Sequence, residues 1–459
     1  MADKLVGLLL AGITFLVICK EWGAPFGAGL VLPLMEIAVL SIFAFQVKLA
    51  RKAFIAVAVG MTLVLAASNP DWRAITQRGL ATAAFIAAFF STLSTLRTAA
   101  QSSPAIQRAG KFLSGQKPGR RYAALTVGGQ MFALLLNYGA IQLLGTLAMA
   151  NARAEPNAEV RFHRMRRMLL AIQRGFISSL PWSPLSFSVA ITTSMIPNTS
   201  WAQIVLPGLV TSAIVAGIGW GLDTAFKPKL SVPAQRSEPE GNWTSLAPLL
   251  ILLGILVVSV STLYSLTGVR IVGIIAMIVP MMAVGWLFIQ TWGGSPLRDT
   301  GRRIRDYLFE ELPAYRGEIT LLMMAGYIGT IGAQLLIPLM SQSALDLGQV
   351  APWVIVVSFV WLIPVLGQVG MNPILAVTLI APLIPHAEDL GVTPTALVVA
   401  ITAGWTLSGA SSPFTATTLL IGNFAGISAL KVGLNWNGAY TLICAVALSV
   451  WVYAYGFLL

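Results

Sequence analysis

Charged side chains are scarce in this chain. Asp, Glu, Lys and Arg make up 10% of the 459 residues, whereas 56% are hydrophobic. Soluble globular domains carry about a quarter charged residues, so this composition excludes an ordinary soluble protein. Apolar runs of roughly 20 residues, the helical span of a bilayer, recur along the whole length. The chain is therefore predicted to be an all-α, polytopic membrane protein with the lipid bilayer as its main partner.

Residues that commonly bind metals or perform nucleophilic catalysis are also rare. Cys19 and Cys444 lie at or inside apolar segments, which fits buried thiols better than a disulfide or a metal site. The two histidines, His163 and His386, lie in a basic loop and near a span end. No nucleophile–base pair or metal set is visible, so we expect no enzyme and no cofactor. The net charge of +12 is assigned to basic cytoplasmic loops rather than to nucleic-acid binding.

Eleven apolar segments are expected to cross the membrane. They lie at residues 4–20, 26–47, 52–69, 79–97, 160–197, 201–226, 245–265, 269–292, 317–342, 394–427 and 434–458. Two further apolar stretches, 122–150 and 352–385, are too long for one helix. Each contains an Asn flanked by small residues or Pro, Asn137 in the first and Asn372 in the second. We expect both stretches to be re-entrant hairpins that enter and leave the membrane on the same side.

The distribution of Lys and Arg orients these spans, because both residues gather in cytoplasmic loops. The flanks of the first hairpin are strongly basic, with Arg97, Arg108, Lys111, Lys117, Arg120 and Arg121 before it and Arg153, Arg161, Arg164, Arg166 and Arg167 after it. The flanks of the second hairpin hold Asp346, Glu388 and Asp389 without Lys or Arg. The first hairpin is therefore expected to open to the cytoplasm and the second to the outside. The N-terminus is predicted to be cytoplasmic and the C-terminus periplasmic or extracellular, in the cytoplasmic membrane. Arg73 and Arg78 are exceptions in an outer loop.

An internal repeat appears when Pro184 is aligned with Pro413. The stretch "GFISSLPWSPLSFS" (175–188) then matches "GWTLSGASSPFTAT" (404–417) without a gap. Because an odd number of crossings separates the copies, the repeat is predicted to have inverted topology, a common construction in secondary transporters that also occurs in some channels. The predicted parts are an N-terminal extra helix (1–25), a first repeat (26–226) with hairpin 122–150 and broken helix 160–197, a cytoplasmic linker (227–244), and a second repeat (245–459) with hairpin 352–385 and broken helix 394–427.

The polar residues of the hairpin tips and helix breaks form the candidate site. A Pro inside a helix removes a backbone donor and frees carbonyls that can bind a cation, while the amides beyond the break can bind an anion. The site is predicted to contain Asn137, Gly139, Ser179, Ser183, Asn372, Ser408, Ser411, Ser412 and Thr415, with Asn137 and Asn372 as sodium ligands. The alternative role for each hydroxyl is a bond to a carbonyl of its own helix, or helix packing.

At these residues the chain resembles the ion transporter superfamily. The stretch "GMNPILAVTLIAPLIP" (370–385), followed by "GWTLSGASSPFTATTLLIG" (404–422), is similar to the second-half core of the divalent anion/sodium symporters and to the large membrane subunit of TRAP transporters. Of the symporters' Ser-Asn-Thr hairpin motif only the Asn is present, as Asn372 and as Asn137. The resemblance implies eleven spans with two hairpins, and a homodimer with a scaffold domain and a mobile transport domain.

The expected function is secondary active transport of a small, carboxylate-like organic anion, coupled to sodium. Neutral oxygen ligands suit a hard cation such as sodium, and no acid lies at a hairpin tip or helix break. Glu36 is the clearest intramembrane acid, but it lies outside the repeat core. Arg174, one turn before its break, is expected either to pair with a substrate carboxylate or to extend towards the inner face. The alternatives are a TRAP-type permease that needs a periplasmic binding protein, and a proton-coupled anion transporter or exchanger.

Overall fold

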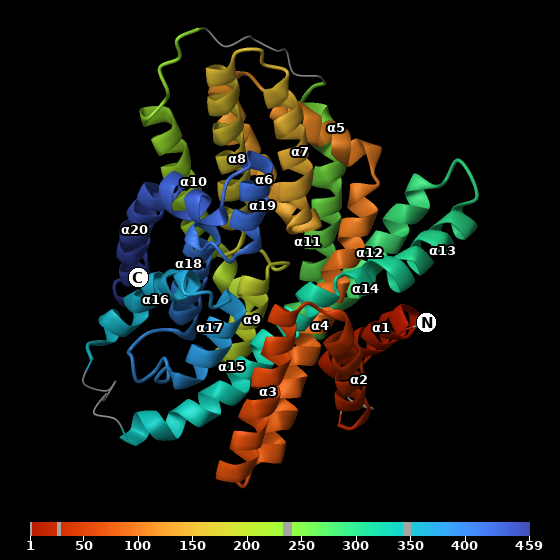
Figure 1. Ribbon diagram of the computed structural model, residues 1–459, viewed down its shortest axis with the longest axis vertical. Coiled ribbons are helices and arrows are strands. Elements are labelled where there is room, and N and C mark those ends of the chain that lie inside the picture. Colours follow the sequence, from red (N-terminus) through yellow and green to blue (C-terminus); the bar gives the residue numbers. More distant parts are fainter. Residues whose placement is uncertain (1, 25–28, 233–240, 343–349) are drawn as a thin grey trace. The chain divides into compact units, whose positions relative to one another are not determined.

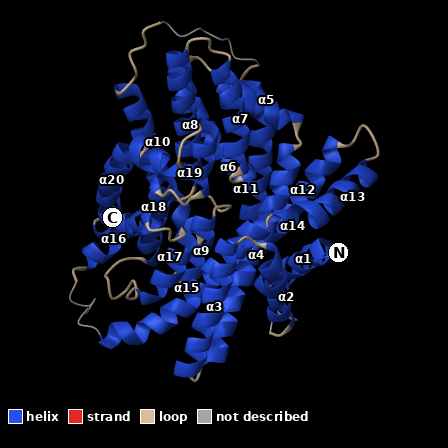
Figure 2. Cartoon of the chain, viewed as in Figure 1, coloured by secondary structure: helices blue, strands red, loops and turns tan. Residues whose placement is uncertain are grey.

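Every regular element of the described chain is a helix. A computed structural model describes residues 2–24, 29–232, 241–342 and 350–459, and these ranges contain no strand (Figure 1, Figure 2). The all-α prediction is confirmed. Part of the predicted span 26–47, part of the linker 227–244, and Asp346 lie outside the described residues.

Nine helices in the described ranges are long and apolar enough to cross a membrane. They cover nine of the eleven predicted spans. Of the other two, span 26–47 contains a helix of 16 residues, and span 160–197 is interrupted and begins with a charged turn. The total of eleven crossings therefore stays a prediction.

The chain forms two compact units, and both draw on the two halves of the sequence. Unit 1 comprises Met1–Ala99, Leu256–Gln349 and Ile374–Ile384, and unit 2 comprises Ala100–Ile255, Val350–Pro373 and Pro385–Leu459. The units thus do not coincide with the predicted repeats, each of which contributes helices to both units.

Unit 1 packs around the apolar side chains of its N-terminal helices. Its elements are α1 (Ala2–Glu21), α2 (Val31–Gln46), α3 (Leu49–Ser68), most of α4 (Trp72–Gln101), the second part of α11 (Ala247–Thr267), α12 (Ile271–Gln290), α13 (Pro296–Asp306), η2 (Tyr307–Glu311), α14 (Leu312–Ala314), α15 (Arg316–Gln342), α17 (Pro373–Ile380) and η4 (Ala381–Leu383). The core contains Leu10, Phe43, Leu65 and Ile331, all fully buried.

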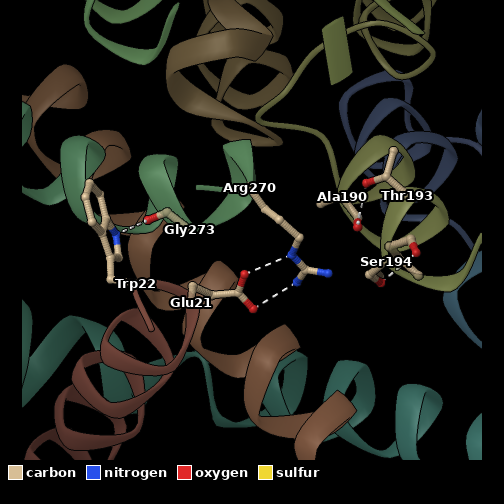
Figure 3. A network of polar contacts seen from close by, with 8 residues as sticks. Glu21, Trp22, Ala190, Thr193, Ser194, Arg270 and Gly273 are labelled. Atoms are coloured by element: carbon tan, nitrogen blue, oxygen red, sulfur yellow. Dashed lines mark hydrogen bonds and ion pairs between the residues drawn. The ribbon is translucent and has the colours of Figure 1, made fainter. Parts of the chain in front are cut away.

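An ion pair joins the end of α1 to the start of α12. Arg270 donates from Nε and Nη2 to the two carboxylate oxygens of Glu21, at 2.9 and 2.8 Å (Figure 3). The indole nitrogen of Trp22 donates to the carbonyl oxygen of Gly273 at 3.2 Å. These contacts hold the C-terminal end of α1 against the N-terminal end of α12.

Unit 2 contains the predicted site. Its elements are α5 (Pro104–Ser114), α6 (Pro118–Leu136), α7 (Gly139–Arg153), α8 (Ala158–Ser179), α9 (Phe187–Met195), α10 (Trp201–Ala225), η1 (Trp243–Leu246), the first part of α11 (Ala247–Thr267), α16 (Pro352–Gln368), α18 (Pro394–Ser411), α19 (Ala416–Ala425), η5 (Lys431–Trp436) and α20 (Gly438–Phe457). The most extensive helix pairs are α6 with α8 and α16 with α18 (Figure 1).

Aligned glycines allow these two helix pairs to approach closely. A Cβ atom added at Gly175 in α8 would overlap the backbone of Thr126 in α6. One added at Gly404 in α18 would overlap the backbone of Phe359 in α16. Because Gly175 and Gly404 are equivalent in the sequence repeat, the same residue performs the same packing role in both copies.

The two predicted hairpins have different packing. In the first, α6 and α7 pack on each other and meet at a turn where Asn137 adopts a positive φ of 49°. In the second, α16 and α17 are separated by residues 369–372, and the boundary between the units falls after Pro373. Accordingly α16 packs on α18 and α20, whereas α17 contacts α15 through a bond from the Thr378 hydroxyl to the Ala325 carbonyl. Re-entry into the membrane stays a prediction for both.

Candidate functional site

Two broken helices lie in unit 2. Helix α8 ends at Ser179 and α9 begins at Phe187, so the first break contains Pro181 and Pro184. Helix α18 ends at Ser411 and α19 begins at Ala416, so the second break contains Pro413. Each Pro lacks an amide hydrogen and cannot continue the hydrogen bonding of the preceding helix.

Both breaks have the same local hydrogen bonds. The amide of Ser183 donates to the carbonyl of Ser179 at 3.0 Å, and the amide of Ser412 donates to that of Ser408 at 2.9 Å. The hydroxyl of Ser183 accepts from the amide of Leu185 at 3.2 Å, and that of Ser412 accepts from Phe414 at 3.3 Å.

A third pair of bonds completes this pattern. Ser186 donates its hydroxyl to the carbonyl of Ser183 at 2.9 Å, and Thr415 donates to that of Ser412 at 3.0 Å. All three pairs are related by the alignment of Pro184 with Pro413. The equivalence therefore extends from residue types to the folding of the turn itself.

Threonines at the start of α19 occupy the carbonyls that the second break frees. Thr417 donates to the carbonyl of Gly409, and Thr418 donates to that of Ser412 at 2.6 Å. Both carbonyls accept side-chain donors, because a buried carbonyl without a partner is costly. Binding of a cation by the carbonyls freed at the breaks stays a prediction.

The second break is also bound to the end of α16. Ser412 donates its hydroxyl to the carbonyl of Gly367 at 2.6 Å, and the side-chain amide of Gln368 donates to the hydroxyl of Ser411 at 3.3 Å. Gly367 also lies against the Ser408 side chain, since an added Cβ there would fall 2.6 Å from its hydroxyl oxygen. The Gly-Gln pair before the predicted hairpin tip is thus part of the site.

A buried polar network connects α8 to the second break. The side-chain amide nitrogen of Gln173 lies 3.4 Å from the carbonyl oxygens of Gly409 and Ala410, and Asn437 donates to its amide oxygen at 3.0 Å. Arg174 donates from Nε to the amide oxygen of Asn437 at 3.1 Å. The broken helices therefore share one set of hydrogen bonds.

Arg174 is held inside unit 2 and does not extend to a surface. Its side chain is 5% exposed, donates from Nη1 to the hydroxyl of Tyr122 at 3.1 Å, and lies 4.1 Å from the centre of the Tyr440 ring. No carboxylate pairs with it among the described residues. Asn437, Tyr122 and Tyr440 provide it with neutral and aromatic partners at depth. Its pairing with a substrate carboxylate and its extension towards the inner face both stay predictions.

The predicted site residues all belong to unit 2, but the observed contacts join only some of them. Ser408, Ser411 and Ser412 surround the end of α16, with Thr415 in the adjoining turn. Ser179 and Ser183 bond within their own break, Ser179 to the carbonyl of Phe176 at 2.7 Å. The convergence of Asn137, Gly139 and Asn372 on the breaks stays a prediction.

The tip of the first hairpin does contact α8. Tyr138, next to the half-buried Asn137, stacks on Phe176 with ring centres 5.1 Å apart. Gly139 is the buried first residue of α7. This stacking positions the tip one turn before the first break.

Five polar residues of the site were missed by the sequence interpretation. They are Gln173, Gln368, Thr417, Thr418 and Asn437. Thr417 and Thr418 lie in the same hydroxyl-rich stretch as Thr415. Gln173 and Asn437 belong to no pattern that marks a site in the sequence, and only the fold brings them to the break.

Not every hydroxyl near the breaks is free to bind a ligand. In α9, Thr193 and Ser194 donate to carbonyls of their own helix (Figure 3). By contrast, the buried hydroxyls of Ser188, Thr192 and Ser408 have no hydrogen-bond partner among the described residues. A buried hydroxyl without a partner costs free energy, so these three are the best candidates for ligand contacts.

Comparison with known proteins shows the fold. No protein-family model matches the chain, and no curated protein is similar to it in sequence. The YdaH transporter of Alcanivorax borkumensis, whose topology is unusual, matches with a TM-score of 0.54 and 15% identity over 88% of this chain and 97% of its own. MtrF of Neisseria gonorrhoeae, which represents a class of antimetabolite efflux pumps, matches with a TM-score of 0.59 and 13% identity over 90% and 96%. At these identities the likeness shows a shared helical membrane fold.

Proposed function

We propose that this chain is a secondary active transporter that moves a small organic anion by alternating access, coupled to sodium. The observation that carries the proposal is the matched hydrogen bonding of two helix breaks within one unit. Inverted repeats with broken helices are a common way to build a transport site at the membrane midplane. The shared fold with YdaH and MtrF, both transporters, supports the same function class.

The breaks supply partial charges of both signs without an acid. The amide ends of α9 and α19 carry a partial positive charge that favours an anion, and the carbonyl ends of α8 and α18 favour a cation. Arg174 adds a full positive charge to the network that joins the breaks. This balance suits an anionic substrate accompanied by a cation.

Sodium is proposed as the co-transported ion because hydroxyl and amide oxygens are ligands of hard cations. A hydroxyl oxygen has two lone pairs, and the amide of Phe414 uses one of those of Ser412, so Ser412 can bond Gly367 and still offer one lone pair to an ion. Ser408, whose hydroxyl has no partner among the described residues, is the first candidate ligand. Asn137 and Asn372 are proposed to complete the site.

A proton-coupled transporter is the second candidate, and Glu36 favours it. This side chain is fully buried in α2, and neither carboxylate oxygen has a hydrogen-bond partner among the described residues. It lines a cavity of about 270 Å³ together with Lys20, Gln77 and Arg78. An intramembrane acid in such a place is a candidate proton site, although it belongs to unit 1 and the breaks belong to unit 2.

The test is uptake of a panel of labelled organic anions by the purified chain in liposomes, with a sodium or potassium gradient and no binding protein. At least one anion is expected to accumulate in the liposomes when a sodium gradient is present. Asn372→Ala is expected to abolish that uptake, although the variant still elutes as a folded protein in size-exclusion chromatography. Normal uptake by the variant would remove Asn372 from the site. A requirement for a binding protein would favour a TRAP-type permease. We further propose a homodimer with a cytoplasmic N-terminus, which crosslinking in the membrane and cysteine labelling would test.

A further inference from the structure

A second polar site lies at one end of unit 2. It is a cavity of about 230 Å³ between the first turns of α6, the first turns of α8 and the segment after α10. Five basic or imidazole side chains line it, namely Arg121, His163, Arg164, Arg167 and Lys227. The pattern of Lys and Arg in the sequence predicts that this end faces the cytoplasm.

Two of these cations are neutralised by acids. Arg164 pairs with Glu155 at 2.7 Å, and Arg167 forms two bonds with Asp223 at 2.8 and 2.6 Å. No ion pair involves Arg121 or Lys227 in the described ranges. The cavity therefore keeps an excess of positive charge.

Arg121 is the most informative of these residues. It is only 6% exposed, and its Nε donates to the carbonyl of Gln116 at 2.7 Å. Its Nη2 is buried and has no hydrogen-bond partner among the described residues. Burial, followed by the charges of Arg164 and Arg167, lowers the pKa of Arg121 to about 10, so it stays charged at neutral pH. A buried guanidinium with an unpaired N–H donor costs free energy, unless a bound anion accepts a hydrogen bond from that donor.

We propose that this cavity binds a phosphate-type oxyanion, with Arg121 as its principal ligand. Apolar side chains of Leu125, Val160 and Met168 also line it, so the bound group has room for an apolar substituent. The phosphate of an anionic lipid headgroup and a soluble phosphate share this chemistry, and basic pockets between membrane helices on the cytoplasmic side commonly bind lipid headgroups. The site is distinct from the helix breaks, and its binding does not depend on transport.

The cavity adjoins the network at the breaks through one residue. Tyr122 lines the cavity and accepts the hydrogen bond from Nη1 of Arg174. An anion bound beside Arg121 therefore lies one side chain away from the buried Arg174. Occupancy of the cavity is expected to influence that network through Tyr122.

The test uses the purified full chain and two neighbouring arginines. Arg121→Gln removes the proposed ligand, whereas Arg120→Gln removes the same charge from an exposed position that does not line the cavity. In the soluble arm, thermal unfolding in neutral detergent is followed against inorganic phosphate, with sodium chloride at matched ionic strength as reference. In the lipid arm, retention of phosphatidylglycerol over phosphatidylcholine is measured by native mass spectrometry from mixed nanodiscs.

Wild type is expected to show saturable stabilisation by phosphate or selective retention of phosphatidylglycerol, and the arm that responds identifies the source. Arg121→Gln should weaken that binding by about tenfold or more, the size of one lost charge-assisted hydrogen bond, while Arg120→Gln should not. If Arg121→Gln fails to fold, Lys227→Gln is expected to weaken the same binding. The proposal is overturned if neither anion binds wild type, or if the cavity variant and Arg120→Gln behave alike.

Discussion

The hydroxyl of Ser412 donates to the carbonyl oxygen of Gly367 at 2.6 Å, both residues being buried in unit 2. This bond ties the second helix break directly to the last turn of α16. In the sequence the two residues are 45 positions apart. Ser412 lies in the repeated stretch 404–417, and Gly367 begins a Gly-Gln pair that also occurs before Asn137, as Gly129-Gln130. The hydrogen bond therefore links two of the predicted site's parts, the broken helix and the segment before the hairpin tip.

Removal of this bond should destabilise unit 2. Ser412→Ala removes the shorter of the two hydrogen bonds to the buried Gly367 carbonyl and leaves only the amide of Gly370 at 3.4 Å, a loss of about 1 kcal/mol or more. The matched control is Ser68→Ala, whose hydroxyl bonds the Val64 carbonyl of its own exposed helix end at 2.8 Å. Thermal unfolding in detergent should show a lower midpoint for Ser412→Ala only. Equal midpoints for the two variants would contradict this interpretation.

The aligned glycines should tolerate no side chain. Gly175→Ala and Gly404→Ala each force a methyl group into a neighbouring backbone, and such overpacking costs about 1–3 kcal/mol. Gly217 in α10 and Gly254 in α11 have open space where a Cβ would lie, so alanine there should be neutral or stabilising. Thermal unfolding midpoints of the four variants should be lower than that of wild type only for Gly175→Ala and Gly404→Ala. An unchanged midpoint for Gly404→Ala would argue against the close α16–α18 contact.

Two donors share the Gly409 carbonyl, and their effects should be coupled. Gln173→Met and Thr417→Val each leave the other donor in place, whereas the double variant leaves the carbonyl with neither. A double-mutant cycle should therefore show an interaction energy of about 0.5–3 kcal/mol. Thr146→Val, which removes an exposed hydroxyl bonded within its own helix, should be additive with Gln173→Met. Additivity of Gln173→Met with Thr417→Val would show that the two side chains do not act on one carbonyl.

The helix breaks could be predicted because their cause is local. Pro184 and Pro413 interrupt the backbone hydrogen bonds wherever they occur, and the residues around them form the same turn twice. The close helix pairs were not predicted, although Gly175 and Gly404, which allow them, are aligned in the repeat. Apolar run length likewise indicated most of the spans, because the bilayer imposes one length on them.

The partners of the freed carbonyls could not be predicted, since they depend on tertiary contacts. Gln173 lies 236 residues from Gly409, and no local pattern joins them. The partners of Arg174 could not be predicted for the same reason, because Asn437 and Tyr122 reach it only in the folded unit. The position of the unit boundary within the second hairpin is also a property of packing, which residue types alone do not reveal.

Substitution of Glu36 distinguishes sodium-coupled transport from proton-coupled transport. If sodium drives transport, Glu36→Gln should keep sodium-dependent uptake, because the substitution keeps the size of the side chain and removes only its ability to ionise. Uptake should be measured in proteoliposomes with opposed sodium and proton gradients. Loss of proton-driven accumulation together with loss of its pH dependence would instead identify Glu36 as the coupling group.

The central claim is that an anion and a sodium ion bind together at the two helix breaks. The most direct measurement is the affinity of the purified chain for its transported anion at several sodium concentrations and several pH values. Linkage is symmetric for binding free energies, so sodium should raise anion affinity and the anion should raise sodium affinity by the same factor. We predict a factor of about ten, or about 1.4 kcal/mol, a size that one ion contact in a partly dry site can supply. An anion affinity that is the same at every sodium concentration but changes with pH would contradict this claim.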